Sequence, residues 1–221
     1  MRRWPATLAS QDGLRPAIVL RPLTRRDRRS WDAVRRVNAE HVGQWEPTMP
    51  DGEPLRMTFR QYVRSLDREG RAGRMYPFAI EVDGHLAGQM HLFGIVDGSL
   101  LSGAAGYWVA RRFGGSGVAT RALAMVCDFA FGAAGLHRVE VNIRPENAAS
   151  LRVVEHLRFR DEGVRRHYLH INGEWRDHRT FALTREDLDT ATAIRRWAGA
   201  SEAGPPGGSD AVQPESSARH D

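Results

Sequence analysis

A run of glycines in the middle of the chain is the stretch whose residue types most directly suggest chemistry. Gly114, Gly115 and Gly117 stand between a predicted strand that ends at Val109 and a predicted helix. The N–H groups of a first helical turn have no partner within the helix, and the helix dipole adds partial positive charge there. Glycines also let a bulky phosphate approach the backbone, because they carry no Cβ. The pattern therefore predicts a phosphate-binding loop.

Two common phosphate loops do not fit these residues. A Walker A loop needs Lys and then Ser or Thr after its last glycine, whereas Val118 and Ala119 follow Gly117. A dinucleotide-binding fingerprint needs Gly or Ala where Thr120 stands. An Arg-x-x-Gly-x-Gly pattern that begins at Arg112 does fit. The alternative is an ordinary glycine turn between a strand and a helix.

Two later segments make the pattern specific. Residues 138–159 contain Arg-Val-Glu-Val-Asn-Ile-Arg-Pro-Glu-Asn-Ala-Ala-Ser, and residues 168–178 contain an x-Gly-x-Trp-x-Asp pattern. With the glycine loop, these segments resemble the GCN5-related N-acetyltransferases (GNAT), and in detail the RimJ/RimL branch, which acetylates the N-termini of ribosomal proteins. The resemblance covers about residues 16–190. It departs at Gly114, where the family usually has Arg or Gln, and at Arg158, where it often has Gly.

The resemblance implies an acetyl-CoA-dependent N-acetyltransferase in which a primary amine attacks the thioester directly, without an acyl-enzyme. The implied acceptor is the α-amine of a protein N-terminus, most simply that of a ribosomal protein. Backbone N–H groups at Trp108-Val109 would stabilise the developing oxyanion. Without a basic side chain at position 114, backbone N–H groups and Arg112 must hold the pyrophosphate. The implied CoA-binding residues are Trp108, Val109, Arg112, Phe113, Gly114, Gly115, Ser116, Gly117, Val118, Ala119, Asn147 and Ser150.

Two carboxylates are candidates for accepting the proton of the amine. Glu140 alternates with apolar residues on a predicted central strand, where a carboxylate can have a shifted pKa and serve as a base. The alternative for Glu140 is a structural ion pair with one of the many arginines. Asp177 shares a strand face with Trp175, so it could receive the ammonium group or relay its proton. Glu46 and His41, near a loop rich in prolines, could also reach the acceptor.

Hydroxyl groups are candidates for protonating the departing thiolate. Asn147 is a predicted helix N-cap, and Ser150 follows one turn later, so both can face one cleft. The resemblance suits Ser150 to the role of acid, against the alternative of a solvent-facing serine. Tyr168 is a second possible acid, although aromatic residues on strands more often belong to the core.

The elements that would position these residues predict an α+β fold. It would be a GNAT-like, mostly antiparallel sheet of seven strands with helices on both faces. The predicted strands cover about 17–21, 78–82, 86–92, 104–109, 136–144, 158–169 and 175–183. The predicted helices run from Thr24 or Asp27 to 39, and over 58–68, 118–131, 147–157 and 184–197. A flexible leader (1–14) and a disordered tail (199–221) would flank one acetyltransferase domain (15–198).

Composition narrows the setting. The 221 residues carry a formal charge of +5, but the arginines alternate with acidic residues, so no direct nucleic-acid binding is expected. No apolar run is long enough to span a bilayer, and a secretory signal is not expected, because no apolar stretch follows the first basic residues. The single cysteine, Cys127, excludes an internal disulfide and is expected to be a buried core thiol. The chain is therefore predicted to be cytoplasmic, as a monomer or homodimer.

A metal is not expected. His167 and His170 are three residues apart on a predicted strand, which places their rings on opposite faces.

Two other functions stay open beside N-terminal acetylation. One is acylation of a small-molecule amine or use of a different acyl-CoA donor. The other is a non-catalytic module that binds or senses acyl-CoA. The sequence leaves the acceptor, the acyl chain and the general base undecided.

Overall fold

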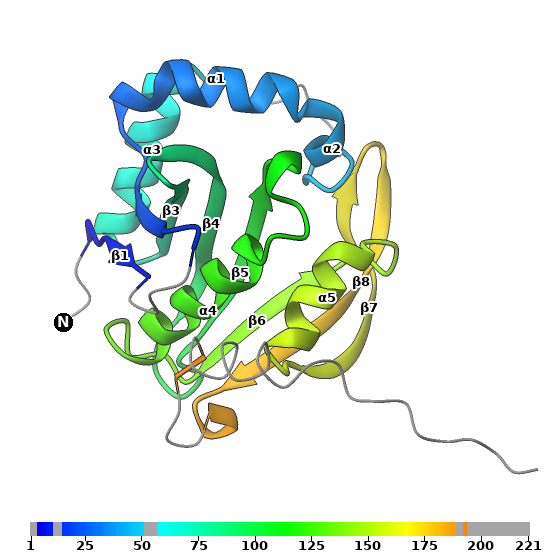
Figure 1. The fold of residues 1–221 in the computed structure, drawn as a ribbon. Coiled ribbons are helices and arrows are strands. Elements are labelled where there is room, and N and C mark those ends of the chain that lie inside the picture. Colours follow the sequence, from blue (N-terminus) through cyan, green and yellow to red (C-terminus); the bar gives the residue numbers. More distant parts are fainter. Residues whose placement is uncertain (1–3, 11–14, 51–56, 189–191, 194–221) are drawn as a thin grey trace, which may run out of the picture.

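Eight strands form one sheet in the order β1-β2-β3-β4-β5-β6-β8-β7 (Figure 1). The structure, a computed structural model, describes residues 4–10, 15–50, 57–188 and 192–193. All neighbouring strands are antiparallel except β5 and β6, which run parallel. The strands are β1 (Leu8–Ala9), β2 (Ile18–Pro22), β3 (Met75–Val82), β4 (His85–Val96), β5 (Ser102–Val109), β6 (Arg138–Ile143), β7 (Arg160–Ile171) and β8 (Glu174–Thr184).

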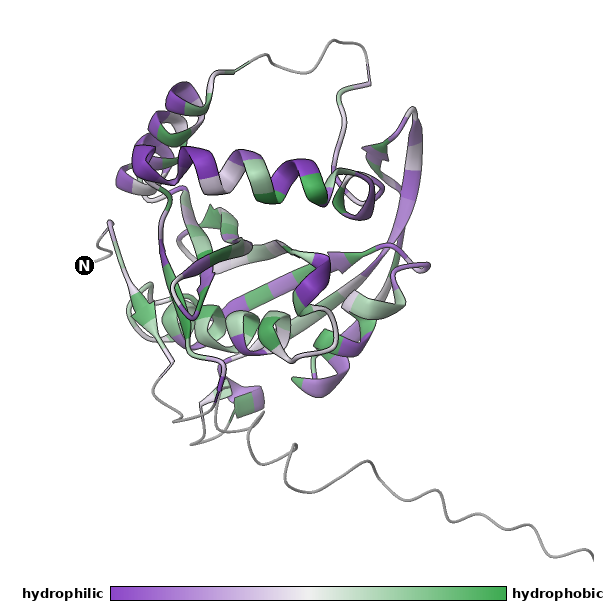
Figure 2. Ribbon diagram, turned by 45° about the horizontal axis from the view of Figure 1, so that its top comes forward, coloured by the Kyte–Doolittle hydropathy of each residue, from purple (hydrophilic) through white to green (hydrophobic). Residues whose placement is uncertain are grey.

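Helices cover both faces of the sheet, as predicted (Figures 1 and 2). On one face, α4 and α5 pack on residues such as Met90 and Leu92 of β4. On the other, α3 and the Trp31 side chain of α1 pack on Ala79 and Leu86. The α-helices are α1 (Arg28–Val37), α2 (Ala39–Gly43), α3 (Phe59–Arg71), α4 (Val118–Phe131) and α5 (Ala148–His156). Short 3-10 helices cover Arg25–Asp27, Arg111–Phe113 and Glu186–Leu188.

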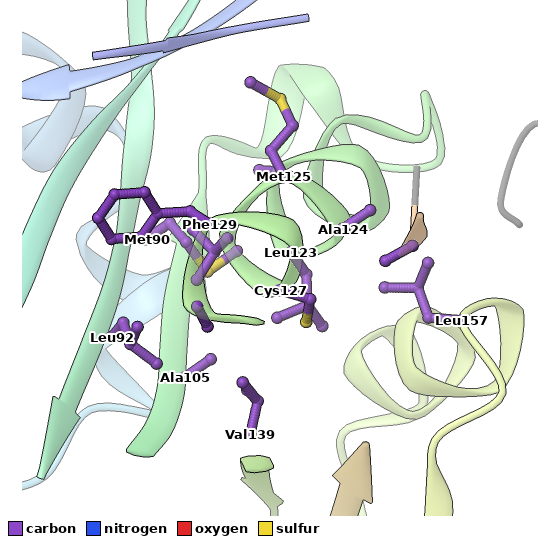
Figure 3. Close-up of a cluster of buried hydrophobic side chains, with 14 of the residues drawn as sticks. Met90, Leu92, Ala105, Leu123, Ala124, Met125, Cys127, Phe129, Val139 and Leu157 are labelled. Carbon is purple, nitrogen blue, oxygen red and sulfur yellow. The ribbon is translucent and has the colours of Figure 1, made fainter. Parts of the chain in front are cut away.

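Helix α4 is the centre of the core. Twelve of its fourteen residues are buried, because the sheet, α5 and the segment around Leu188 surround it. Its ribbon is coloured as apolar along nearly its whole length in Figure 2, and its side chains fill the cluster in Figure 3. Cys127 lies in this cluster, where burial raises the pKa of its thiol well above the usual value. The prediction of a buried core thiol is therefore confirmed.

The sheet has one strand more than the seven predicted, and the extra strand lies in the expected leader. Leu8 and Ala9 pair with β2, so the structure differs from the prediction of a flexible segment there. Trp4 supports this strand: its ring packs edge-on against Phe78 with centroids 5.6 Å apart, and its Nε1 donates to Asp67 at 3.1 Å. A two-residue strand is too short for alternation to reveal it in the sequence.

The predicted helix to residue 39 is broken at Asn38. This residue is buried, and its Nδ2 donates to the Val34 carbonyl at 2.8 Å. Its Oδ1 accepts the backbone N–H of Arg111 at 2.8 Å, which ties the corner between α1 and α2 to the loop after β5. The break follows from these bonds, since a short amide side chain competes with the backbone for hydrogen bonds.

The end of the chain is described only in part. The predicted helix 184–197 begins as the 3-10 turn Glu186–Leu188, and most of its remainder lies outside the described residues, as does the predicted tail 199–221. In the described part of the chain, none of the helices combines the length and the apolar character needed to cross a bilayer.

Strands β5 and β6 separate soon after they pair. Their ladder joins Ser102 to Arg138, Gly103 to Val139 and Ala104 to Glu140, and then stops, although both strands continue (Figure 1). Each strand keeps its other neighbour: β5 stays paired with β4 up to Val109, and β6 with β8 up to Ile143. The sheet therefore opens between two strands that are each held in place from outside.

One glycine fixes the β5 side of this opening. A Cβ built on Gly88 would meet the Trp108 carbonyl oxygen at 2.1 Å, because the backbone of β5 passes directly against this position. We expect Gly88→Ala to lower the free energy of unfolding by about 1–3 kcal/mol, as overpacking does. Urea unfolding measures this. Gly43→Ala in α2 is the control, since a Cβ at that position would have no atom within 4 Å. Equal midpoints for both variants would contradict the prediction.

Candidate active site at the opening between β5 and β6

The glycine loop leads into the N-terminus of α4 as predicted. Gly115 and Gly117 have φ values of 74° and 76°, in the left-handed region that favours glycine. The first backbone bond of the helix runs from the Arg121 N–H to the Gly117 carbonyl at 3.0 Å. The N–H groups ahead of it, from Val118 to Thr120, have no helical acceptor. The loop therefore presents free donors at the positive end of a helix dipole, which suits a phosphate.

The other residues of the loop divide into two groups. The Gly114 N–H donates to the Arg111 carbonyl at 2.9 Å, and the Ser116 hydroxyl donates to the Phe113 carbonyl at 2.6 Å. These groups hold the turn together. Arg112 is exposed, and its guanidinium carbon lies 4.6 Å from the Phe113 ring centroid. Within the described residues, Arg112 forms no ion pair. Its charge is therefore available to an anion.

A cavity of about 420 Å³ lies at the opening. Its wall combines the separated ends of β5 and β6 with side chains from both faces of the sheet. Of the residues predicted from the sequence, it includes Trp108, Asn147, Ser150, Tyr168 and Glu46. It also includes Trp45, Tyr62, Gln89, His91, Tyr107, Asn142, Arg144 and His178. The cavity thus connects the side of α5 with the side of α1 and α3.

Asn147 and Ser150 lie on the α5 side of the cavity. The Asn147 Oδ1 accepts the Ser150 backbone N–H at 3.1 Å, which confirms the predicted N-cap. The Tyr107 hydroxyl is buried beside them; burial raises its pKa to about 12, and an interaction with Ser150 partly opposes that shift. Both hydroxyls therefore stay protonated at neutral pH, as a proton donor must.

The candidate base Glu140 is held by two arginines. One of its carboxylate oxygens accepts from Arg138 at 2.9 Å and the other from Arg165 at 2.9 Å. Glu140 is absent from the lining of the cavity, which includes its strand neighbours Val141 and Asn142. This geometry favours the structural ion pair over the catalytic role, because both oxygens already bind guanidinium groups.

Asp177 and Tyr168 are placed differently from one another. The Asp177 Oδ1 accepts the His167 backbone N–H at 2.8 Å, and Asp177 is absent from the cavity lining. His167 has a φ of 47°, so this bond stabilises an irregular point of β7. Tyr168 does line the cavity, and its hydroxyl accepts from Arg165 at 3.2 Å. The structure brings Tyr168, but not Asp177, to the opening.

Of the two further residues considered for the acceptor, Glu46 lies after α2 and lines the cavity, whereas His41 lies within α2 and does not line it. Both Glu46 carboxylate oxygens accept from Arg35, at 2.6 and 2.7 Å. The Arg35 guanidinium carbon in turn lies 5.1 Å from the Trp108 ring centroid and 5.8 Å from that of Trp31. This ion pair forms one wall on the side of α1.

Three polar residues of the cavity lining, two on β4 and one on β8, were not predicted from the sequence. Gln89 is buried, and its Oε1 accepts from the Tyr62 hydroxyl at 3.0 Å and faces the Trp108 indole N–H at 3.4 Å. Burial lowers the pKa of His91 to about 4, so that ring is neutral. His178 also lines the cavity. The available signal was alternation, since Gln89 and His91 flank the apolar Met90 on one strand.

No cluster of metal-binding side chains exists within the described residues. The Nδ1 of His170 lies 2.8 Å from the Thr48 hydroxyl and 3.1 Å from the Thr48 carbonyl, so this ring joins β7 to the loop after α2.

Comparison with known proteins gives a consistent set of similarities. The family described as "Acetyltransferase (GNAT) domain" matches residues 17–160, more than half of the chain. The solved structure of Mycobacterium smegmatis RimJ in complex with CoA-disulfide is similar with a TM-score of 0.80 and 38% identity; the match covers 90% of this chain and 96% of that one.

Two curated relatives agree with this. "Probable N-acetyltransferase YjcK" of Bacillus subtilis is 34% identical over 139 residues, which is 62% of this chain and 74% of the relative. The "[Ribosomal protein uS5]-alanine N-acetyltransferase" of Escherichia coli is 25% identical over 152 residues, which is 68% of this chain and 78% of the relative.

The loop geometry predicts how one substitution affects binding. A side chain at Gly115 would be strained at a φ of 74° and would stand beside the free N–H groups. We expect Gly115→Val to weaken CoA binding about tenfold or more, measured by isothermal titration calorimetry. Gly135→Val is the matched control, because Gly135 has a similar φ of 64° and lies beyond the C-terminal end of α4, opposite the glycine loop. Equal CoA affinity in both variants would show that the loop is only a turn.

Proposed function

The chain belongs to the GNAT acetyltransferase family, and we propose that it transfers the acetyl group of acetyl-CoA to the α-amine of a protein N-terminus, with a ribosomal protein as substrate. The observation that carries this proposal is the opening between β5 and β6. On the α5 side of this opening the cavity wall carries hydroxyl groups. On the side of α1 and α3 it carries polar and aromatic groups. A donor and an acceptor can therefore meet there from opposite faces of the sheet.

The residues of the loop and the opening fit acetyl-CoA. The free N–H groups from Val118 to Thr120 and the exposed Arg112 suit its pyrophosphate. Asn147 and Ser150 line the cavity where the arm of CoA would reach the opening. Acetyl-CoA supplies the activated acyl group. Gly114 and Ser116 were also expected to bind acetyl-CoA. They would act by shaping the turn, because the Gly114 N–H and the Ser116 hydroxyl already donate to carbonyl groups of the loop.

The amine side has room for more than a small molecule. A second depression of about 680 Å³ is lined by Trp31, Arg35 and Met57 and shares Glu46, Tyr62 and Gln89 with the cavity. A peptide segment could lie there with its first residue at the opening. The names of the relatives support the same class of acceptor, since one is RimJ and another acts on an alanine of a ribosomal protein.

The chemistry we propose is direct transfer. Cys127 lies in the core among α4 side chains and does not line the cavity, so it offers no acyl-enzyme. Ser150 would give a proton to the thiolate as the C–S bond breaks, and the buried Tyr107 hydroxyl would support it. Tyr168 stays a second candidate for this role.

The predictions of a cytoplasmic monomer or homodimer without direct nucleic-acid contacts also stay predictions.

Peptide acetylation tests the function. Ala- and Ser-starting peptides from ribosomal proteins should gain one acetyl group on the α-amine, with one equivalent of thiol released from acetyl-CoA. Tandem mass spectrometry locates the group, and the same peptides with a blocked N-terminus and a free lysine are the control. Turnover only with small amines would favour the small-molecule alternative. CoA binding without turnover on any amine would favour a non-catalytic module, and failure to bind CoA would contradict all three.

Ser150→Ala tests the proton donor. The substitution keeps the backbone N–H that Asn147 accepts, so α5 should stay capped. We expect kcat to fall about 10²-fold or more, the lower range for general acid catalysis, with little change in CoA affinity. Ser10→Ala is the control, because its hydroxyl accepts the Ile18 N–H near the far edge of the sheet. Wild-type kcat in Ser150→Ala would assign the proton to another group.

A further inference from the structure

His178 lines the cavity in which the proposed function places the amine, yet neither the glycine loop nor the proposed proton donor involves it. It lines the cavity from β8, two residues from Thr180, whose hydroxyl donates to Asn142 Oδ1 at 2.8 Å. Successive odd or even positions of a strand share a face, so His178 lies on the face of Thr180. The residue is only 4% exposed. The cavity is therefore the place where this buried ring can meet a ligand.

Hydrogen bonding determines the tautomer of His178. Its Nδ1 lies 3.1 Å from the Arg176 carbonyl oxygen, which can only accept a hydrogen bond. In the neutral ring Nδ1 therefore carries the proton, and Nε2 carries a lone pair. Within the described residues Nε2 has no hydrogen-bond partner, and it is not among the polar atoms that the protein encloses. It is open to a proton donor in the cavity.

The surroundings keep this lone pair free at neutral pH. Burial is the main cause that lowers the pKa of His178, and the positive charge of Arg144 adds to it. The Arg176 carbonyl, Glu146 and Asp177 act in the opposite direction but do not cancel the effect. From β7, Tyr168 contacts the ring edge-on with centroids 5.6 Å apart. Because this pKa lies below the ordinary histidine value of about 6.5, the imidazole is mostly unprotonated at neutral pH.

We propose that His178 is the general base, which takes up at Nε2 the proton that the acceptor amine loses when it attacks the acetyl thioester. The proposal rests on the function proposed above and identifies a residue for it. As the C–N bond forms, the nitrogen becomes positively charged and strongly acidic, and a proton passes from it to Nε2. The C–S bond then breaks, its electron pair stays on sulfur, and sulfur takes a proton from the Ser150 side. The imidazolium then releases its proton to water and the Ser150 side takes one up from water, so that the net change moves one proton from nitrogen to sulfur.

The other basic groups nearby are less suitable. Both oxygens of Glu46 bind Arg35, and both oxygens of Glu140 bind arginines. The Nε2 of His91 is enclosed by protein, and with a pKa of about 4 that ring is a weaker base. Among these groups, His178 alone combines a free lone pair with a position in the cavity wall.

Two substitutions separate the base from a structural role. In His178→Asn the amide nitrogen can still donate to the Arg176 carbonyl, while the basic Nε2 is lost. We expect kcat to fall about 10²- to 10⁴-fold, the usual contribution of general base catalysis, with unchanged CoA affinity and melting temperature. His85→Gln is the matched control, because His85 is exposed at the turn between β3 and β4 and should keep wild-type kcat.

Chemical rescue completes the test. In His178→Ala, added imidazole should restore part of kcat, in proportion to the fraction of imidazole that is neutral as pH is varied. Wild-type kcat in His178→Asn would overturn the proposal. So would a loss of activity that imidazole does not restore or that accompanies loss of CoA affinity, because His178 would then be structural. A wild-type enzyme that binds CoA but acetylates no N-terminal peptide would instead contradict the proposed function.

Discussion

The early end of the ladder between β5 and β6 is the constraint on which the site depends. Three residue pairs hold these strands together, and beyond them the facing backbone groups have no strand partner in the described sheet. Buried backbone N–H and C=O groups need hydrogen-bond partners, so the opening is suited to a ligand that brings amide groups of its own. The opening persists because β4 and β8 hold the two strands from outside. Gly88 permits the close approach that keeps β5 in this position.

Helix α4 connects stability with binding. Its buried side chains build most of the core on one face of the sheet, while its N-terminus supplies the donors of the glycine loop. The loop does not have to be ordered by a ligand, because the helix behind it is fixed by packing. This explains how a site without a basic residue at position 114 can still present a rigid set of N–H groups.

Local patterns in the sequence predicted much of the fold and the donor side of the site. The helix 118–131 matches residue for residue, since apolar residues fill it and glycines bound it. The Asn147 cap was also predicted correctly, because a cap depends on neighbouring residues. The partners of Glu140 and Asp177 were not predictable in this way. Arg165 lies 25 residues from Glu140 and meets it only through strand pairing. The role of His178 depends on its tautomer, which a contact in space determines.

The two ends of the sheet have a consequence for how the protein behaves among its own copies. An unpaired edge strand is a template onto which another chain can add, and this leads to aggregation. Strand β1 at one edge has only two residues, so it offers a short template. Strand β7 at the other edge is long, but charged residues such as Arg160, Glu162 and Arg166 stand along it, and two irregularities interrupt its register. Both edges thus discourage sheet-to-sheet growth, which protects a protein whose central strands already part from one another.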